Sequence, residues 1–309
     1  MAAGEFPPHV LREYALIADG ERGALIGPRG DISWLCVPRW HSDAVFASLI
    51  GGGGVYSVTP AERFVWGGYY EEGSLIWRGR WITSSGVVEC RDALAFPGDR
   101  DTAVILRRLS AIDCAATLRV VLDPRAGFGA RALRAAKRDD AGRWTAQAGE
   151  VYLRWSGDTG GARVQGGRQG PRLVTELAVP PGGQRDLVLE LSSRRFTEPP
   201  PEPDRLWHVT EEQWAGAVPR LENVLATRDA RHAYAVMRGL TSASGGMVAA
   251  ATTSLPERAE AGRNYDYRYA WIRDQCFAGH AAAAAGAYPL LDEAVKFVGT
   301  RLLADGPKL

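Results

Sequence analysis

The chain of 309 residues is almost balanced in charge, with 37 basic and 36 acidic residues and a formal net charge of +1. This balance argues against a nucleic-acid-binding protein, and the length together with 46% hydrophobic residues indicates two globular domains. The sequence has neither an apolar leader nor a stretch near the ~20 apolar residues of a membrane span, which favours a cytoplasmic protein without membrane partners.

The first part of the chain is typical of β structure. Short apolar runs alternate with Gly, Asp and Pro turns, and crossover helices do not intervene. We therefore predict an N-terminal antiparallel β-sandwich over residues 1–197. After the early hairpins at 16–37, its strand candidates are 74–82, 86–94, 102–111, 114–122, 142–147, 150–155, 172–179 and 185–192.

A proline-rich run separates this part from the rest. Residues 198–203 read Glu-Pro-Pro-Pro-Glu-Pro, which favours an extended chain and predicts a linker over 198–209. Thr210 and Gln213 then form a capping box, which predicts the start of a linker helix at Thr210. Its apolar positions recur at helical spacing: Trp214, Val218, Leu221, Val224 and Leu225.

The end of the chain predicts two consecutive helices. An alanine-rich run favours a helix over 274–285, which Gly286 ends, and a second helix begins near Pro289. Their apolar faces need partners, so we expect 210–309 to be an incomplete helical domain. Three acidic residues here are expected to be surface charges: Asp292, Glu293 and Asp305.

Residues 264–274, which we name the aromatic segment, carry four aromatic and four charged side chains in Asn-Tyr-Asp-Tyr-Arg-Tyr-Ala-Trp-Ile-Arg-Asp. Burying charge is costly unless it is paired, so a polar pocket with aromatic walls fits this mixture. Flat apolar faces beside hydrogen-bonding groups suit a sugar ring. Asp274 alone is also explained as a helix N-terminal residue that interacts with free N–H groups. The neighbouring aromatic rings favour sugar binding.

The aromatic segment resembles the signature of glycoside hydrolase family 15, the glucoamylase and trehalase-like enzymes. Residues 14–20 and 30–42 are similar to the opening of the trehalase-like N-terminal domain, and 251–257 to the stretch that precedes the signature. The resemblance covers almost the whole chain. Three positions depart from the usual pattern, with Tyr, Ala and Gln in place of Trp, Cys and a small residue: Tyr265, Ala270 and Gln275.

The resemblance implies a β-sandwich joined to an (α/α)6 catalytic barrel, of which this chain holds the first helices. It implies that Arg273 and Asp274 bind the hydroxyls of a terminal glucose, and that Tyr267 and Trp271 line the same subsite. Family members invert configuration with two carboxyl groups that flank the bond. Both are glutamates in later barrel helices, so we assign no catalytic residue here and expect the acid and base beyond Leu309.

We therefore expect the N-terminal part of an exo-acting α-glucoside hydrolase, truncated within its catalytic domain and inactive alone. Its substrate would be an α-glucoside such as trehalose or a malto-oligosaccharide. An inverting glycoside phosphorylase and a non-catalytic carbohydrate-binding protein are the alternatives. The four cysteines form no CxxC pair and have no histidine at metal-ligand spacing, so we expect neither a metal nor a cofactor. The oligomeric state is left open.

Overall fold

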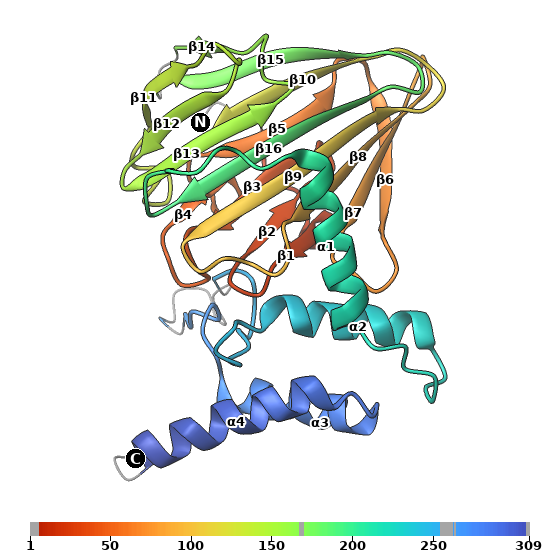
Figure 1. Cartoon of the computed structure of the whole chain (residues 1–309), viewed down its shortest axis with the longest axis vertical. Coiled ribbons are helices and arrows are strands. Elements are labelled where there is room, and N and C mark those ends of the chain that lie inside the picture. Colours follow the sequence, from red (N-terminus) through yellow and green to blue (C-terminus); the bar gives the residue numbers. More distant parts are fainter. Residues whose placement is uncertain (1–5, 167–169, 254–261, 263, 307–309) are drawn as a thin grey trace.

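The computed structural model describes residues 6–166, 170–253, 262 and 264–306. Within these residues, antiparallel strands make up the N-terminal part of the chain and α-helices follow (Figure 1). The predicted class, an antiparallel β domain followed by helices, is confirmed. No helix in the described ranges is both long and apolar enough to cross a bilayer.

The strands form two eight-stranded sheets. The first has the order β1 (Ala15–Ala18), β2 (Gly23–Ile26), β3 (Asp31–Cys36), β5 (Val55–Pro60), β10 (Ala116–Asp123), β15 (Arg172–Val179) and β14 (Arg163–Gln165), with β4 (Ala44–Phe46) paired to β3. The second has the order β11 (Leu133–Arg138), β12 (Trp144–Ala148), β13 (Val151–Gly157), β16 (Gln184–Ser192), β9 (Thr102–Ala111), β8 (Val87–Leu94), β7 (Trp77–Thr83) and β6 (Phe64–Tyr70). Two 3-10 turns lie at Leu11–Glu13 and Ser48–Ile50.

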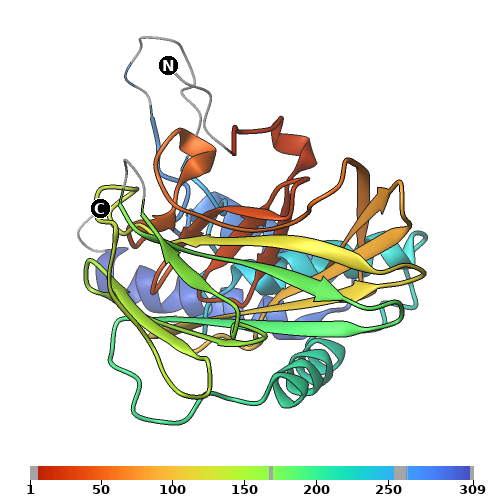
Figure 2. The ribbon, with the colours of Figure 1, turned by 90° about the horizontal axis from the view of Figure 1, so that it is seen from above.

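The second sheet is buried on both faces at its centre. In β9, Ile105 and Leu109 pack into the core between the sheets, as the two-residue period of a strand requires. Leu106 points the other way and joins Val188 of β16 in a second core. That second core lies under α1 (Pro203–Ala217), which runs along the outside of the sandwich (Figure 2).

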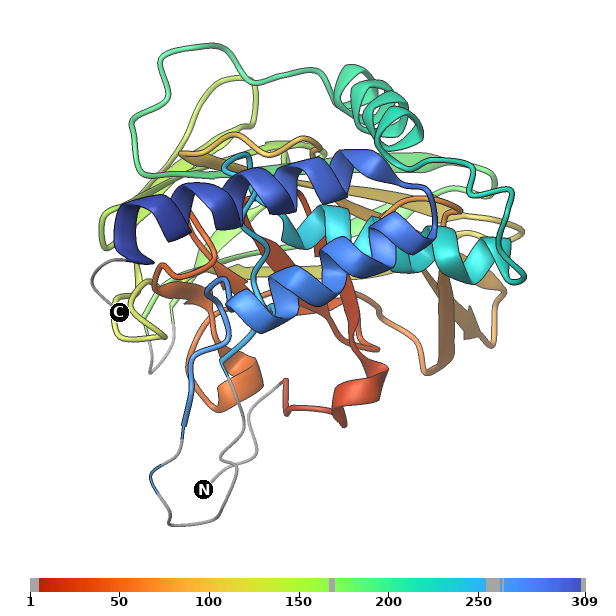
Figure 3. The ribbon, with the colours of Figure 1, turned by 90° about the horizontal axis from the view of Figure 1, so that it is seen from below.

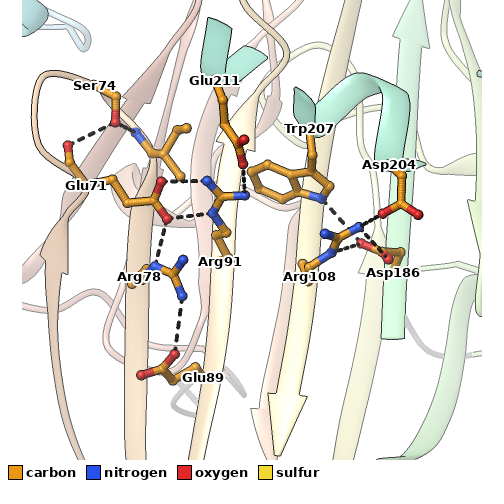
Figure 4. A network of polar contacts seen from close by, with 11 residues as sticks. Glu71, Ser74, Arg78, Glu89, Arg91, Arg108, Asp186, Asp204, Trp207 and Glu211 are labelled. Carbon is orange, nitrogen blue, oxygen red and sulfur yellow. Dashed lines mark hydrogen bonds and ion pairs between the residues drawn. The ribbon is translucent and has the colours of Figure 1, made fainter. Parts of the chain in front are cut away.

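Two arginines of the second sheet hold α1 by charge (Figure 4). The Arg91 guanidinium lies 4.3 Å from the centroid of the Trp207 ring and bonds Glu71 at 2.5 Å and Glu211 at 2.6 Å. Arg108 bonds Asp186 and Asp204, and Trp207 Nε1 donates to Asp186. Arg91 therefore contacts α1 twice, through a cation–π contact with the Trp207 ring and an ion pair with Glu211.

The predicted helix start at Thr210 is wrong, because α1 begins at Pro203 inside the predicted linker 198–209. Proline is tolerated in the first turn of a helix, where its missing N–H would have no helical partner. Thr210 lies buried within the helix, and its Oγ1 accepts a hydrogen bond from the Phe96 N–H at 3.3 Å. The helix ends before Pro219, so the apolar residues beyond it are not helical.

Three further helices follow: α2 (Thr227–Leu240), α3 (Ile272–Ala284) and α4 (Tyr288–Asp305). The alanine-rich run and the run from Pro289 form helices as predicted, whereas α2 was not predicted. Helix α2 packs on β1, where Gly239 leaves room for Ala18 and Leu75. Helices α3 and α4 lie side by side as a hairpin at the same end of the sandwich (Figure 3), and apolar side chains on both reach solvent: Phe277, Val295, Leu302 and Leu303.

We predict that Trp207→Ala lowers the free energy of unfolding by about 3–5 kcal/mol, because it removes a buried ring and its cation–π contacts with Arg91 and Arg108. Urea unfolding followed by circular dichroism measures the change. Val209→Ala on the exposed side of α1 is the control and should change stability by less than about 0.5 kcal/mol. A loss below about 1 kcal/mol for Trp207→Ala would show that α1 does not depend on this ring.

Candidate functional site

The aromatic segment runs in a non-helical conformation until α3 begins at Ile272. Its carbonyls pair with a second segment, since Ala249 N–H donates to Tyr269 O at 3.0 Å and Ala250 N–H donates to Tyr267 O at 2.9 Å. Trp34 of β3 then donates from Nε1 to Ala251 O at 2.9 Å. The 248–251 segment therefore bonds both the sandwich and the aromatic segment.

Arg268 is the buried residue of the aromatic segment, with an exposed fraction of 7%. Its Nε bonds Asp266 Oδ1 at 3.0 Å and its Nη2 bonds Oδ2 at 2.7 Å. Its Nη1 donates to Ser42 O at 2.8 Å, Trp40 O at 3.4 Å and Cys36 Sγ at 3.3 Å. The last three acceptors belong to residues 36–42, which we name the sandwich loop.

Burial and the ion pair shift the pKa values of these groups in defined directions. Burial raises the pKa of the Cys36 thiol to about 11, although Arg268 opposes the shift. Burial also acts to raise the pKa of Asp266, but the hydrogen bonds from Arg268 outweigh it and hold that pKa below its ordinary value. Asp266 is therefore a carboxylate and Cys36 a neutral thiol near neutral pH.

Two of the four predicted sugar-binding residues contact each other through their rings. The ring centroids of Tyr267 and Trp271 lie 5.2 Å apart with the planes at 47°, and the Tyr265 ring meets Trp271 edge-on at 5.6 Å. These rings form an aromatic surface next to the start of α3. Tyr269 is directed elsewhere and stacks on His41 of the sandwich loop at 5.6 Å and 26°.

The other two predicted residues pair in the first turn of α3. Arg273 Nη2 donates to Asp274 Oδ2 at 3.0 Å, and the exposed side-chain fractions are 65% and 28%. Within the described ranges the carboxylate accepts its hydrogen bonds from Arg273 and none from a backbone N–H. Both polar groups follow Trp271 in the first turn of α3, while their sugar-binding role stays a prediction.

A cavity of about 780 Å³ lies between the sandwich loop, the turn at 242–246, the aromatic segment and the end of α4. Tyr269, His41 and Phe297 are among its lining residues, and none of the four predicted residues lines it. Trp40 is buried at its edge, where Nε1 donates to Gly20 O at 2.8 Å. The cavity and the predicted sugar groups are therefore distinct features of this part of the fold.

Sequence reasoning did not assign roles to Arg268 and Gln275. Gln275 is buried, and its Oε1 accepts from the Met247 N–H at 2.7 Å, which ties α3 to the turn before the 248–251 segment. Glu293 was expected to be a surface charge, but it is half-buried and pairs with Arg238 of α2 at 2.7 Å. Among the described residues, no cluster of His, Cys, Asp and Glu could hold a metal ion.

Comparison with known proteins gives consistent matches. The family model for the trehalase-like N-terminal domain matches residues 2–194, and that for glycosyl hydrolases family 15 matches 230–305. The chain is 31% identical over 316 residues to a trehalase of Mycobacterium tuberculosis, covering 88% of this chain and 43% of that protein. It is 30% identical over 320 residues to a trehalase of Mycolicibacterium smegmatis, covering 88% and 44%.

Among solved structures, a bacterial glucoamylase complexed with acarbose matches with a TM-score of 0.64 and 11% identity. The match covers 99% of this chain and 53% of the glucoamylase, and it shows the shared fold. The chain spans less than half the length of the two mycobacterial trehalases.

We predict that Asp266→Asn removes an acid-dependent part of the stability of the aromatic segment. Because the folded pKa of Asp266 is below the ordinary value of about 4, its ion pair stabilises the wild type above that value and is lost as the pH falls through the folded pKa. Protection of the Ala249 amide from hydrogen exchange between about pH 5 and pH 2.5 reports this loss.

The control is Asp139→Asn, which removes an exposed carboxylate whose pKa is lowered by Arg143. The control should keep the wild-type acid dependence at Ala249. If Asp266→Asn keeps it too, the Asp266 ion pair does not hold the segment.

Proposed function

Because the chain belongs to the trehalase-like members of glycosyl hydrolases family 15, we propose that it binds the terminal glucose of an α-glucoside for an inverting, exo-acting hydrolase. The observation that carries the proposal is the Arg273–Asp274 pair in the first turn of α3, which directly follows the Tyr267–Trp271 ring contact along the chain. Arg273 donates to sugar oxygens and Asp274 accepts from sugar hydroxyls. The rings of Tyr267 and Trp271 pack against the C–H face of the sugar.

The pair suits this role because its two members are held but not fully buried. In the free chain the guanidinium and the carboxylate satisfy each other at 3.0 Å. A glucose hydroxyl can bond both groups without separating them, since the carboxylate has further lone pairs and the guanidinium has further N–H donors. Each such charge-assisted hydrogen bond contributes about 1.5–3 kcal/mol.

We propose trehalose as the substrate ahead of a malto-oligosaccharide. The proposal rests on the trehalase-like domain over residues 2–194 and on the mycobacterial relatives, which are trehalases. The terminal glucose is common to both substrates, so the four residues named here serve either one. The second sugar unit would distinguish them.

We assign the general acid and base to the part of the relatives beyond the matched span. The matches cover 43% and 44% of the mycobacterial trehalases. Inverting hydrolysis needs two carboxyl groups roughly 6.5–9.5 Å apart with a water between them. The exposed apolar side chains of α3 and α4, such as Phe277 and Leu302, are the faces that further barrel helices would cover. By itself the chain binds sugar without cleaving it.

We predict that Asp274→Ala weakens trehalose binding by about 1.5–3 kcal/mol, or roughly tenfold to a hundredfold, because a charge-assisted hydrogen bond is lost and Arg273 loses its partner. Saturation-transfer NMR titration of the 309-residue chain measures the affinity. Asp292→Ala, which removes an exposed carboxylate of α4, should bind as the wild type does. Equal affinity of Asp274→Ala and wild type would remove Asp274 from the site.

We also predict that the purified 309-residue chain releases no glucose from trehalose or maltose above the rate in buffer, since both catalytic carboxylates are assigned elsewhere. A coupled glucose assay makes the measurement. Enzyme-dependent release would overturn that assignment while leaving the sugar-binding residues in place.

A further inference from the structure

Arg268 differs from the four proposed sugar-binding residues in its surroundings. It is 7% exposed, whereas the Arg273 side chain, five residues later, is 65% exposed. Its neighbours are a carboxylate, two backbone carbonyls and a thiol, which together occupy all three of its nitrogens. Arg268 also lines the cavity, but protein acceptors already bond each of its three nitrogens, so its contacts indicate a structural role.

The contacts of Arg268 instead join two distant parts of the chain. Asp266 belongs to the aromatic segment itself, while the carbonyl acceptors at Trp40 and Ser42 belong to the sandwich loop. The same loop places His41 against Tyr269. Two consecutive residues of the aromatic segment, Arg268 and Tyr269, are therefore attached to the sandwich. Trp271 of the proposed sugar site follows two residues later.

A guanidinium fixes geometry more strictly than a single bond does. The two parallel bonds from Nε and Nη2 to Asp266 set the orientation of the guanidinium plane. The third nitrogen, Nη1, then faces its acceptors in the sandwich loop. Tyr267 O and Tyr269 O, on either side of Arg268, are at the same time held by the N–H groups of Ala250 and Ala249. The backbone on both sides of Arg268 is thus determined.

We propose that Arg268 is a positioning residue for the sugar site: by binding Asp266 and the sandwich loop, it holds Tyr267, Trp271, Arg273 and Asp274 in their binding arrangement. The β-sandwich is then a working part of that site. This inference rests on the proposed function for the identity of the ligand, while the anchoring of the segment stands on the contacts alone.

The test compares Arg268→Gln and Arg268→Lys with a matched control, Arg154→Gln. Arg154 is also buried, forms two bonds to one carboxylate, Glu190, and donates to the carbonyls of Glu198 and Pro199, but it lies in the sandwich. Loss of either arginine destabilises the chain, so stability does not distinguish them. Two other measurements distinguish the variants at the two positions: amide exchange at Ala249 and Ala250, and trehalose affinity by saturation-transfer NMR.

We expect Arg268→Gln to lose the protection of both amides and to bind trehalose at least about tenfold more weakly. Arg268→Lys should recover part of both, because it keeps the charge but cannot form two parallel bonds to Asp266. Arg154→Gln should keep protection and affinity, and amides of β9 and β16 should stay protected in the Arg268 variants. Wild-type protection and affinity in Arg268→Gln would overturn the proposal. Lost affinity with intact protection would overturn it too, because Arg268 would then contact the sugar directly.

The two proposals fail separately. If the wild type binds no glucoside, the proposed function fails, and loss of amide protection in Arg268→Gln alone decides whether Arg268 positions the segment. If the wild type and Arg268→Gln bind trehalose equally, the positioning role fails and the proposed function stands.

Discussion

A buried guanidinium has to find an acceptor for its donors, and at Arg268 that requirement connects the two halves of the chain. Its carboxylate partner, Asp266, is local, but its other acceptors lie at Cys36, Trp40 and Ser42 of the sandwich. Leaving such a charge without these partners would cost several kcal/mol. The path of the aromatic segment is therefore set by the sandwich loop before any ligand is present.

Further contacts between strands and helices also attach the helical part to the sandwich. Helix α1 is held on the second sheet by Arg91 and Arg108. Helix α2 is held at the turn after β1, where Gly20 N–H donates to Gly239 O at 2.9 Å. Helix α3 is tied through Gln275 to Met247. The sandwich thus supports the start of the helical part at several points, as a scaffold that orients functional groups must.

The sequence was informative where the signal is local. The run at 102–111 was predicted as a strand and β9 has those bounds, and the alanine-rich run forms α3. The prediction failed at Pro203. The proline-rich run was expected to be a linker without helix, but its last proline occupies the first turn of α1. Arg268 could not be assigned from sequence, since Ser42 precedes it by 226 positions and carries no signal of contact. Arg273 and Asp274 are adjacent in sequence and pair with each other, and Tyr267 and Trp271 are in ring contact, while their shared role in sugar binding stays a prediction.

The central claim is that a sugar binds the aromatic segment at the start of α3, on the side that the sandwich holds in place. A crystal structure of the 309-residue chain with trehalose tests it most directly. We expect one glucose ring on Trp271, with its hydroxyls within hydrogen-bonding distance of Arg273 and Asp274. A sugar bound instead in the cavity beside His41 and Tyr269, with Arg273 and Asp274 unoccupied, would contradict it.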